Sequence, residues 1–373
     1  MTGLYIHVPF CAKKCHYCNF VIAPAAPAEN RRVFLEALEK EARRCEHVFS
    51  DTVFDTVYIG GGTPSVLEAD ELERLFHILR GHFRWNSDAE VTCEANPGDV
   101  GLSKAMRMKK LGVNRVSLGA QSFHDDTLAR LNRAHNAAQI ESSFRHLRDA
   151  GFDNISLDLI LSLPGEGWER VRGSLEKLIR LDPEHVSVYE LTVEDKTVFG
   201  ELQKQGRLGL PGEEEQVEIL SNTRLFLKNN GWRHYELLSY AKRGYESRHN
   251  LLYWANENTL GLGPGAYSYI QGRRYRLSDS YRQYLEKTAS GDWSATEDET
   301  LSAERREIES FVLALRLTDG TSLGRFPGAA RTLAGELAGL QEKGLLDREE
   351  DRVNLSAKGQ LFAETVFSQL SAC

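Results

Sequence analysis

Six short runs of apolar and β-branched residues alternate with longer amphipathic stretches through the first two thirds of the chain. This alternation is typical of βα units around a parallel sheet, for which right-handed crossovers allow few topologies. Six units are too few to close an eight-stranded barrel, so the sequence predicts an α/β fold with an open, partial (β/α)6 barrel and chemistry at the C-terminal ends of its strands. The predicted strands are residues 4–8, 56–59, 90–94, 115–119, 155–161 and 185–191.

Between these strands, apolar residues recur at the spacing of a helix, which predicts helices that each bury one face. The predicted buried faces are Phe34, Leu38, Ala42, Cys45 and Phe49; Leu72, Leu75, Phe76, Leu79 and Phe83; and Ile140, Phe144 and Leu147. Helices and strands together indicate a core between the sheet and its covering helices.

The pattern changes after about residue 231, where Tyr, Asn and Gly become frequent and residues 260–269 (LGLGPGAYSY) predict a loop. Helical spacing returns from about residue 302 with Ile308, Phe311, Val312 and Leu315, and residues 337–370 predict a helix, two short strands and a helix. We therefore expect a barrel over 1–230, a connecting region over 231–301, and a small C-terminal α+β, winged-helix-like domain over 302–373. The predicted wing carries Asp347, Glu349, Glu350 and Asp351, which would repel DNA and favour a packing or gating role.

The composition is that of an ordinary globular protein, with 373 residues, 41% hydrophobic and 27% charged. The net charge of −8 argues against a nucleic-acid partner. No apolar run reaches bilayer length and no signal peptide is recognisable, so we expect a cytoplasmic protein. In that reducing compartment the six cysteines should not form disulfides. Cys45 and Cys93 are predicted core residues, and Cys373 a solvated tail residue.

Three of the cysteines, Cys11, Cys15 and Cys18, form a C-x3-C-x2-C motif directly after the first predicted strand. A four-iron cluster held by three thiolates leaves one iron open to a non-protein ligand. The alternative is a structural zinc site completed by His7 or His16, but no second Cys/His pair of suitable spacing follows. The motif therefore favours an iron–sulfur cluster over zinc.

With an aromatic residue, Tyr17, before its last cysteine, the motif resembles the signature of the radical S-adenosylmethionine (SAM) superfamily. The rest of the chain is similar to the group that contains the oxygen-independent coproporphyrinogen oxidases and the HemW-type heme chaperones. The similar features are Tyr5 in the first strand, GGGTPS at 60–65, EANP at 94–97, GAQSF at 119–123, LNR at 131–133, DLILSLPG at 158–165 and HNLLYW at 249–254.

This resemblance implies a [4Fe–4S] cluster on the three motif cysteines, with SAM beside it. It implies that Glu94 accepts hydrogen bonds from the SAM ribose, that Arg133 meets the methionine carboxylate, and that Gln121 and Asp158 complete the site. Taken singly, each of these residues suits an internal salt bridge or a helix cap equally well. The expected cofactor-binding residues are Tyr5, Tyr17, Phe20, Gly61, Gly62, Thr63, Glu94, Gln121, Arg133 and Asp158.

Gly61 and Gly62 follow the second predicted strand and lack a Cβ, so the backbone can approach a ligand closely, which suits the amino group of SAM. No Gly-Lys-Ser/Thr follows them, which excludes a P-loop. A plain tight turn is the alternative interpretation of the glycines alone.

Two departures separate the chain from the oxidases within the group it resembles. The oxidases carry a further cysteine two residues after the third ligand, where Phe20 stands here, and a longer N-terminal extension than the ten residues before Cys11. The resemblance thus implies a heme chaperone that binds heme and delivers it to acceptor proteins. The alternative is an oxygen-independent coproporphyrinogen III oxidase, which decarboxylates porphyrinogen propionates. Whether the chain is an enzyme stays open, and Phe20 argues against the oxidase.

The HNLLYW motif offers candidate heme contacts, because imidazole is a common heme ligand and aromatic rings present flat apolar faces. His249 is the candidate ligand, and Asn250, Tyr253 and Trp254 are the candidate heme-binding neighbours. The alternative is a histidine satisfied by hydrogen bonds in a loop. Family resemblance further implies bacterioferritin or respiratory heme proteins as acceptors, admits a homodimer, and admits a peripheral position at the membrane during heme delivery.

Overall fold

The computed structural model describes residues 1–372; Cys373, the predicted tail residue, lies outside them. Its largest element is a twelve-stranded sheet in the order β14-β13-β12-β11-β1-β4-β5-β6-β7-β8-β10-β9. The strands are β1 (Thr2–Val8), β4 (Val53–Gly61), β5 (Arg84–Ala95), β6 (Arg115–Gln121), β7 (Ile155–Leu161), β8 (His185–Glu190), β9 (Arg233–Glu236), β10 (Ser239–Ala241), β11 (Asn258–Leu262), β12 (Tyr267–Ile270), β13 (Arg273–Arg276) and β14 (Glu297–Thr300).

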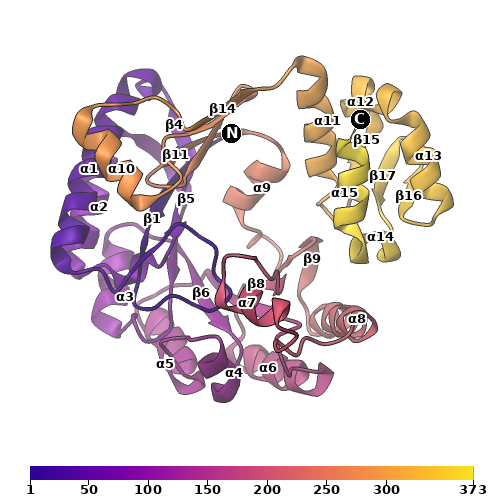
Figure 1. Cartoon of the computed structure of the whole chain (residues 1–373), viewed down its shortest axis with the longest axis horizontal. Coiled ribbons are helices and arrows are strands. Elements are labelled where there is room, and N and C mark those ends of the chain that lie inside the picture. The colour runs from indigo at the N-terminus through magenta and orange to yellow at the C-terminus, as the bar shows by residue number, and fades with distance from the viewer. Residues whose placement is uncertain (373) are drawn as a thin grey trace.

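The six predicted strands correspond to β1, β4, β5, β6, β7 and β8, which are parallel neighbours in this order. Helices cover the outer face of the curved sheet, and the sheet does not close into a barrel (Figure 1). The predicted α/β fold with a partial barrel is therefore confirmed. The helices of this part are α1 (Ala28–Phe49), α2 (Ala69–His82), α3 (Leu102–Lys110), α4 (Asp125–Arg130), α5 (Ala137–Asp149), α6 (Trp168–Leu181), α7 (Val198–Lys204), α8 (Glu213–Asn229), α9 (Arg248–Trp254) and α10 (Tyr281–Ser290).

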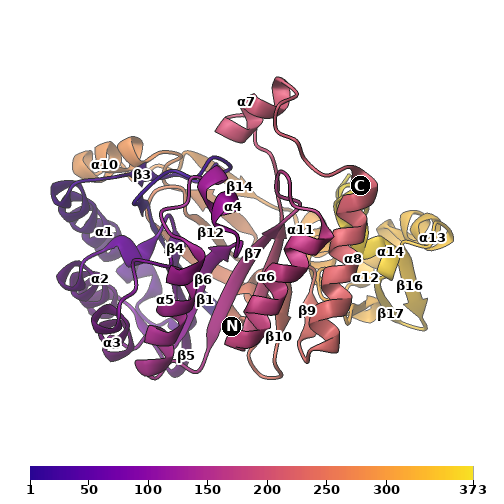
Figure 2. The same ribbon diagram turned by 90° about the horizontal axis from the view of Figure 1, so that it is seen from below.

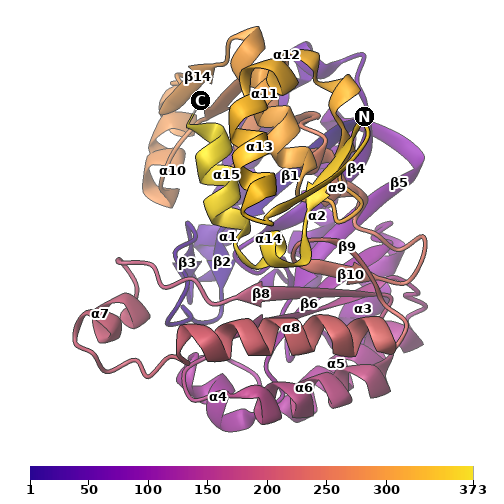
Figure 3. The same ribbon diagram turned by 90° about the vertical axis from the view of Figure 1, so that its right-hand side faces the viewer.

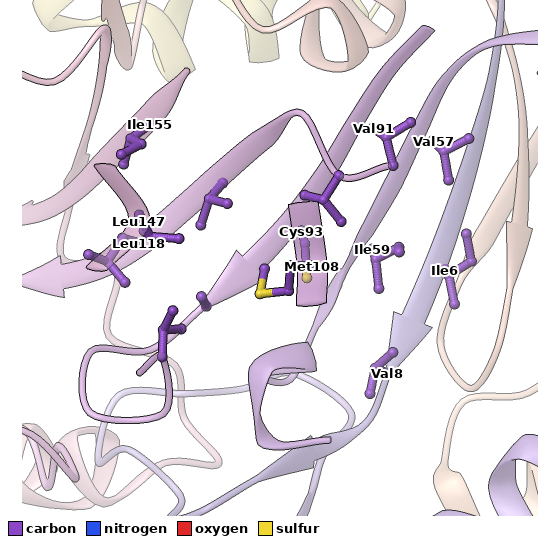
Figure 4. Packing of buried hydrophobic residues seen from close by; sticks show 14 of the residues in the cluster. Ile6, Val8, Val57, Ile59, Val91, Cys93, Met108, Leu118, Leu147 and Ile155 are labelled. Atoms are coloured by element: carbon purple, nitrogen blue, oxygen red, sulfur yellow. The ribbon is translucent and has the colours of Figure 1, made fainter. Parts of the chain in front are cut away.

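The main core lies between the sheet and these helices. Ile6, Ile59 and Cys93 point into it from neighbouring strands (Figure 4) and are each at most 1% exposed. Because side chains alternate along a strand, Tyr58 and Glu94 lie on the opposite face, inside the curved sheet. The predicted faces of α1, α2 and α5 are buried in this core, with Cys45 half-buried on α1. One face of each strand thus packs against the covering helices, and the other lines the inside of the curved sheet.

The prediction of a loop over residues 260–269 was wrong. Residues 258–262 form β11, which pairs in parallel with β1, and β12 then returns antiparallel to β11. The turn is confined to the residues between the two strands, where Gly263 and Gly265 have φ angles of 97° and 81°. The many glycines in this stretch favoured a loop prediction. The strands form because β11 pairs with β1, which is distant in sequence.

The C-terminal part forms a second, smaller core, to which Leu237 of the β9–β10 turn also contributes. The predicted helix, two strands and helix are present, and β17 lies in the middle of a three-stranded sheet. The elements are α11 (Ala303–Ala314), β15 (Thr321–Ser322), the 3-10 turn Leu323–Arg325, α12 (Pro327–Thr332), α13 (Ala334–Glu342), β16 (Leu346–Glu349), β17 (Arg352–Leu355), α14 (Ala357–Leu361) and α15 (Ala363–Ser371).

Short elements at the C-terminal ends of the strands complete the fold. They are β2 (Phe10–Cys11), β3 (Ala23–Pro24) and the 3-10 turn Pro64–Val66. In the same region, α7 and its flanking loops project away from the body of the molecule (Figure 2). Across residues 1–372, every helix is too short or too polar to traverse a lipid bilayer.

Candidate functional site

A pocket of about 490 Å³ opens at the C-terminal ends of the parallel strands. Residues at or near the C-terminal ends of β1, β4, β5, β6, β7 and β8 contribute to its wall. Cys11, Cys15 and Cys18 line it together, and all three thiols are free and half-buried. This is the edge of a parallel sheet at which barrel enzymes place their chemistry.

Backbone hydrogen bonds fix the cysteine loop over this edge. The amide of His16 donates to the carbonyl of Leu131 at 3.1 Å, and the carbonyl of His16 accepts from the amide of Phe199 on α7 at 3.0 Å. The His16 ring nitrogen Nδ1 contacts the carbonyl of Arg130 at 2.9 Å, and His7 Nε2 contacts the carbonyl of Val21 at 2.8 Å. Neither histidine of the zinc alternative lines the pocket.

Arg133 connects the cysteine loop to the ends of two strands. Its Nη1 donates to Cys15 Sγ at 3.4 Å and to the Tyr17 hydroxyl at 3.5 Å. Its Nη2 donates to the carbonyl of Gly119 at 2.9 Å and to Oδ1 of Asn96. The Nε atom of Arg133 is buried without a hydrogen-bond partner among the described residues. The guanidinium thus still has a donor to offer in the pocket.

A second chain of hydrogen bonds ends on another cysteine. Asn96 Nδ2 donates to the Thr63 hydroxyl at 2.9 Å, and that hydroxyl donates to Cys11 Sγ at 3.5 Å. Hydrogen bonds to cluster sulfurs are one of the ways in which a protein sets a reduction potential. Thr63 is therefore placed to influence whatever metal centre Cys11 holds.

Two buried carboxyl groups lie on the pocket floor. Glu94 accepts from the Tyr58 hydroxyl at 2.7 Å and from the amide of Gly61 at 3.2 Å. Asp158 accepts from Ser117 at 2.9 Å and from Ser156 at 3.0 Å. Burial, with a smaller contribution from Asp158, raises the pKa of Glu94 to about 7, and burial also raises the pKa of Asp158. No cation pairs directly with either group in residues 1–372, so the floor can accept hydrogen bonds from a polar ligand.

Glycines bring the backbone close to the pocket. A Cβ on Gly62 would lie 2.7 Å from the carbonyl of Phe10, and Gly61 has a φ of 102°. Gln121 also has a positive φ, 66°, and its Oε1 is buried without a hydrogen-bond partner among the described residues. An unusual backbone angle and an unpaired acceptor are both features that a ligand would explain.

The pocket brings together the three cysteines and all but one of the predicted cofactor-binding residues; Tyr5 is the exception. Tyr5 lies deeper in the interior, where its hydroxyl contacts His7 Nδ1 at 3.2 Å. Phe20 is at the rim with 69% of its surface exposed. The residues brought together are Tyr17, Phe20, Gly61, Gly62, Thr63, Glu94, Gln121, Arg133 and Asp158.

Sequence reasoning missed one segment of this wall and several of its polar residues, including Lys13, Asn19, Asn96 and Ser117. Asn96 lies two residues after Glu94 in the EANP motif and accepts from Arg133, and Ser117 on β6 donates to Asp158 at 2.9 Å. Residues 189–194, after β8, also line the pocket. The position of Asn96 directly after a strand was a usable signal, since polar residues at strand ends meet at one edge.

The HNLLYW motif lies away from this pocket, on α9 rather than in a loop. Figure 1 shows α9 within the opening of the curved sheet, and α9 contacts β1, β4, β11 and α11. His249 is 1% exposed, with its ring stacked on Tyr58 at a centroid distance of 5.0 Å. Its Nδ1 contacts the Thr56 hydroxyl at 2.7 Å, and its Nε2 contacts the Tyr253 hydroxyl at 3.1 Å. Burial, with Arg115 as a smaller cause, lowers the pKa of His249 to about 3, so the ring is neutral.

The other motif residues differ in exposure. Tyr253 is 37% exposed, while one face of the Trp254 ring is covered by the guanidinium of Arg316 at 4.1 Å from the ring centroid. The amide of Asn250 belongs to the cap at the start of α9, where it donates to Ser247 Oγ at 3.4 Å. In this conformation neither ring nitrogen of His249 is free to bind iron.

Comparisons with known proteins agree with this geometry. The family model of the Radical SAM superfamily matches residues 5–178, and that of the HemN C-terminal domain matches residues 301–362. A relative from Bacillus subtilis (strain 168), named heme chaperone HemW, is 37% identical over 98% of this chain and 98% of its own length. One of the same name from Lactococcus lactis subsp. lactis (strain IL1403) is 35% identical over 99% of this chain and 97% of its own.

Among solved structures, coproporphyrinogen III oxidase (HemN) from Escherichia coli, described as a radical SAM enzyme, has a TM-score of 0.89 to this chain at 24% identity. The match covers 99% of this chain and 90% of that one, and it concerns the fold. Fold, pocket and family matches together define a member of the radical SAM superfamily. Within that superfamily the chain belongs to the HemW family, because relatives above 30% identity cover nearly its whole length.

Membership of the superfamily implies a [4Fe–4S] cluster and SAM as cofactors. The pocket fits them, since it joins three free thiols, two buried carboxyl groups, an unpaired Gln121 oxygen and an unpaired Arg133 donor in one cavity. Among residues 1–372 no set of three or more Cys, His, Asp or Glu side chains converges on the position of a single metal ion.

Proposed function

We propose that the chain is a heme chaperone that binds heme and passes it to heme-acceptor proteins, with a [4Fe–4S] cluster and SAM as resident cofactors. The observation that carries this proposal is the similarity to relatives named heme chaperone HemW, which reaches 37% identity and extends over 98% of the chain. Phe20 supports it against the oxidase alternative, because a cysteine is expected at that position in the oxidases.

In this proposal, Cys11, Cys15 and Cys18 hold the cluster and leave one iron for SAM. That iron would supply a site where the sulfonium nucleotide binds and accepts an electron. The backbone beside Gly61 and Gly62 approaches the amino group of SAM.

The remaining pocket residues recognise the rest of the nucleotide. Arg133 meets its carboxylate through a charge-assisted hydrogen bond, and Glu94 accepts hydrogen bonds from the ribose. Gln121 and Asp158 complete the polar wall, and Thr63 and Tyr17 support the loop that carries the cysteines. Tyr5 has an indirect role, because its ring packs against Tyr58 at a centroid distance of 6.1 Å and Tyr58 bonds Glu94.

For heme, His249 stays the proposed iron ligand, together with Asn250, Tyr253 and Trp254. A neutral imidazole is the form that binds iron, and the low pKa of His249 favours that form. Ligation at Nε2 requires that the contact with Tyr253 is lost and that α9 moves outward from the sheet. We therefore propose that heme binding and displacement of α9 are coupled, and that acceptors of the bacterioferritin or respiratory type receive heme from the displaced state.

The test is an anaerobic titration of the reconstituted chain with heme, followed by absorbance. The proposal expects stoichiometric binding, a changed spectrum in His249→Ala, and movement of heme from the loaded chain to an added heme-free acceptor. A chain that does not bind heme contradicts the proposal. Incubation with coproporphyrinogen III separates the alternative, since a decarboxylated product would identify an oxidase.

A further inference from the structure

A second cavity of about 370 Å³ lies between the edge of the barrel and the C-terminal part. One wall consists of the end of β8 and one face of α8, and the other of α14, α15 and Arg316, which lies two residues after α11; α8 faces these helices in Figure 3. Tyr189, Glu190 and Thr192 also line the cysteine pocket, so the two cavities share a wall. The volume of this second cavity is within the range of ordinary small-molecule sites.

Two arginines with incomplete hydrogen bonding point into this cavity. Arg224 on α8 donates Nη2 to the carbonyl of Gln360 at 3.3 Å, whereas Arg316 stacks on Trp254 at 4.1 Å and lies 5.8 Å from the Phe367 ring. The Nε atom of each is buried without a hydrogen-bond partner in residues 1–372. Burial lowers the pKa of both guanidinium groups, because their charge is poorly solvated. Both cations would gain from a bound anion.

Among the described residues, no carboxyl group forms an ion pair with either of these arginines. Glu190 and Glu364 line the cavity and Glu236 lies behind it, but within the described residues none of them is within 4.0 Å of either guanidinium. Burial raises the pKa of Glu190 and of Glu236. The two guanidinium groups therefore remain available to a ligand.

The rest of the wall is mixed, with apolar side chains beside the polar residues Thr192, Gln360 and Thr365. Leu220, Leu238, Leu361 and Phe367 surround the arginines, and Phe362 at the rim is 46% exposed. Two cations beside these leucine and phenylalanine side chains suit a molecule that combines an apolar ring with carboxylates on one edge. Heme, with two propionate groups, has this character, while SAM and other highly polar nucleotides do not.

We propose that Arg224 and Arg316 bind the propionate carboxylates of heme in this second cavity, with Phe362 and Phe367 against the porphyrin. This site rests on the proposed heme-chaperone function and specifies where the carboxylates are recognised. Because Arg316 covers Trp254 at the end of α9, a ligand that engages Arg316 also reaches the helix that carries His249. The contact between Arg316 and Trp254 would thus couple carboxylate binding to the proposed movement of α9.

The experiment compares heme with its dimethyl ester, which keeps the ring and the iron but has no carboxylate. The full-length chain is titrated with each in the same detergent buffer and binding is followed by absorbance. We expect the free acid to bind at least about tenfold more tightly than the ester, since hydrogen bonds to charged groups are lost with the ester. In the double variant Arg224→Gln/Arg316→Gln this preference should disappear, with the affinity for the free acid lowered at least about tenfold.

The matched control is Arg331→Gln, which removes the same charge from an exposed position on α12 outside the cavity and should behave like the wild type. Equal binding of acid and ester by the wild type overturns the site without any variant. The proposal can therefore be tested even when the double variant does not fold. A folded double variant that keeps the preference also overturns it. A wild type that binds neither compound contradicts the heme function itself, and the site falls with it.

Discussion

The carboxyl group of Glu94 lies buried between Tyr58 and Gly61, and its pKa is raised from 4.5 to about 7. The folded chain therefore binds this proton more tightly than the unfolded chain, so the free energy of unfolding falls as the pH rises from about 4.5 to about 7 and stays lowered above. Glu94→Gln removes the ionisable group and with it this loss of stability at high pH. We expect its Tm to exceed that of the wild type by on the order of 2–4 °C at pH 8 in the metal-free chain.

At pH 4 the difference should be small, because Glu94 is then largely protonated in both the folded and the unfolded chain. Thermal melts at the two pH values measure it, with Glu213→Gln, an exposed residue at the start of α8, as the control. The variant should at the same time lose SAM affinity, which isothermal titration checks on the reconstituted protein. Identical Tm values at pH 8 would show that Glu94 is not destabilising.

Thr63 offers a second test at the scale of one residue, since its hydroxyl donates to Cys11 Sγ at 3.5 Å. A hydrogen bond to sulfur stabilises the more negative, reduced cluster and so raises its potential. Thr63→Val should lower the reduction potential by on the order of 20–40 mV, which corresponds to about 0.5–1 kcal/mol for a one-electron couple. A redox titration followed by electron paramagnetic resonance measures the shift, and Thr63→Ser should restore it. A valine variant with the potential of the wild type rejects this role.

Helix α9 is the element whose position the proposed function depends on most. Its first turn is held by Glu90, which accepts from the amides of Arg248 and His249, both at 3.0 Å. These are charge-assisted caps on a short helix, so Glu90→Gln should lower the free energy of unfolding by about 1–2 kcal/mol. Hydrogen exchange should show faster exchange of the α9 amides, while α5, which has its own Asn136 cap, stays unchanged. Equal exchange in α9 would mean that Glu90 does not hold the helix.

Elements built from local patterns were predictable from sequence, whereas those built from distant pairing were not. The short β-branched run from Thr56 to Ile59 predicted β4, and the apolar face of α1 followed from helical spacing. By contrast, β11 contains two residues that read as turn formers and becomes a strand only because β1 supplies the partner for Leu260. The burial of His249 was equally invisible, since it depends on Thr56 and Tyr58 far away in the chain.

At the scale of the whole molecule, the barrel and the C-terminal part meet through the β9–β10 turn. Leu237 leaves the barrel sheet to join the C-terminal core, where it is 7% exposed. Leu237→Ala should therefore lower the free energy of unfolding by about 2–4 kcal/mol, as expected for a buried leucine. Urea unfolding measures this, with Leu225→Ala, 59% exposed on α8, expected to change it by less than about 0.5 kcal/mol. Equal effects of the two variants would argue against a shared core.

The site as a whole was more predictable than the way the molecule surrounds it. Strand ends predicted the cysteines and Glu94 at one edge, because parallel strands bring their C-terminal ends together, whereas Arg133 was expected there only from the family resemblance. The segment after β8 and the second cavity have no motif of their own, and they arise only when the C-terminal part packs against α8. The boundaries proposed for the connecting region remain predictions, since β11 to β14 continue the barrel sheet.

The central claim is that three thiolates hold a cluster with one iron left for SAM in the larger pocket. Electron paramagnetic resonance of the anaerobically reconstituted, reduced chain, recorded with and without SAM, tests it most directly. We predict a [4Fe–4S] signal that changes when SAM is added and that is absent when Cys11, Cys15 and Cys18 are replaced by serine. A wild-type chain that holds no iron, or a cluster signal that SAM leaves unchanged, would contradict the claim.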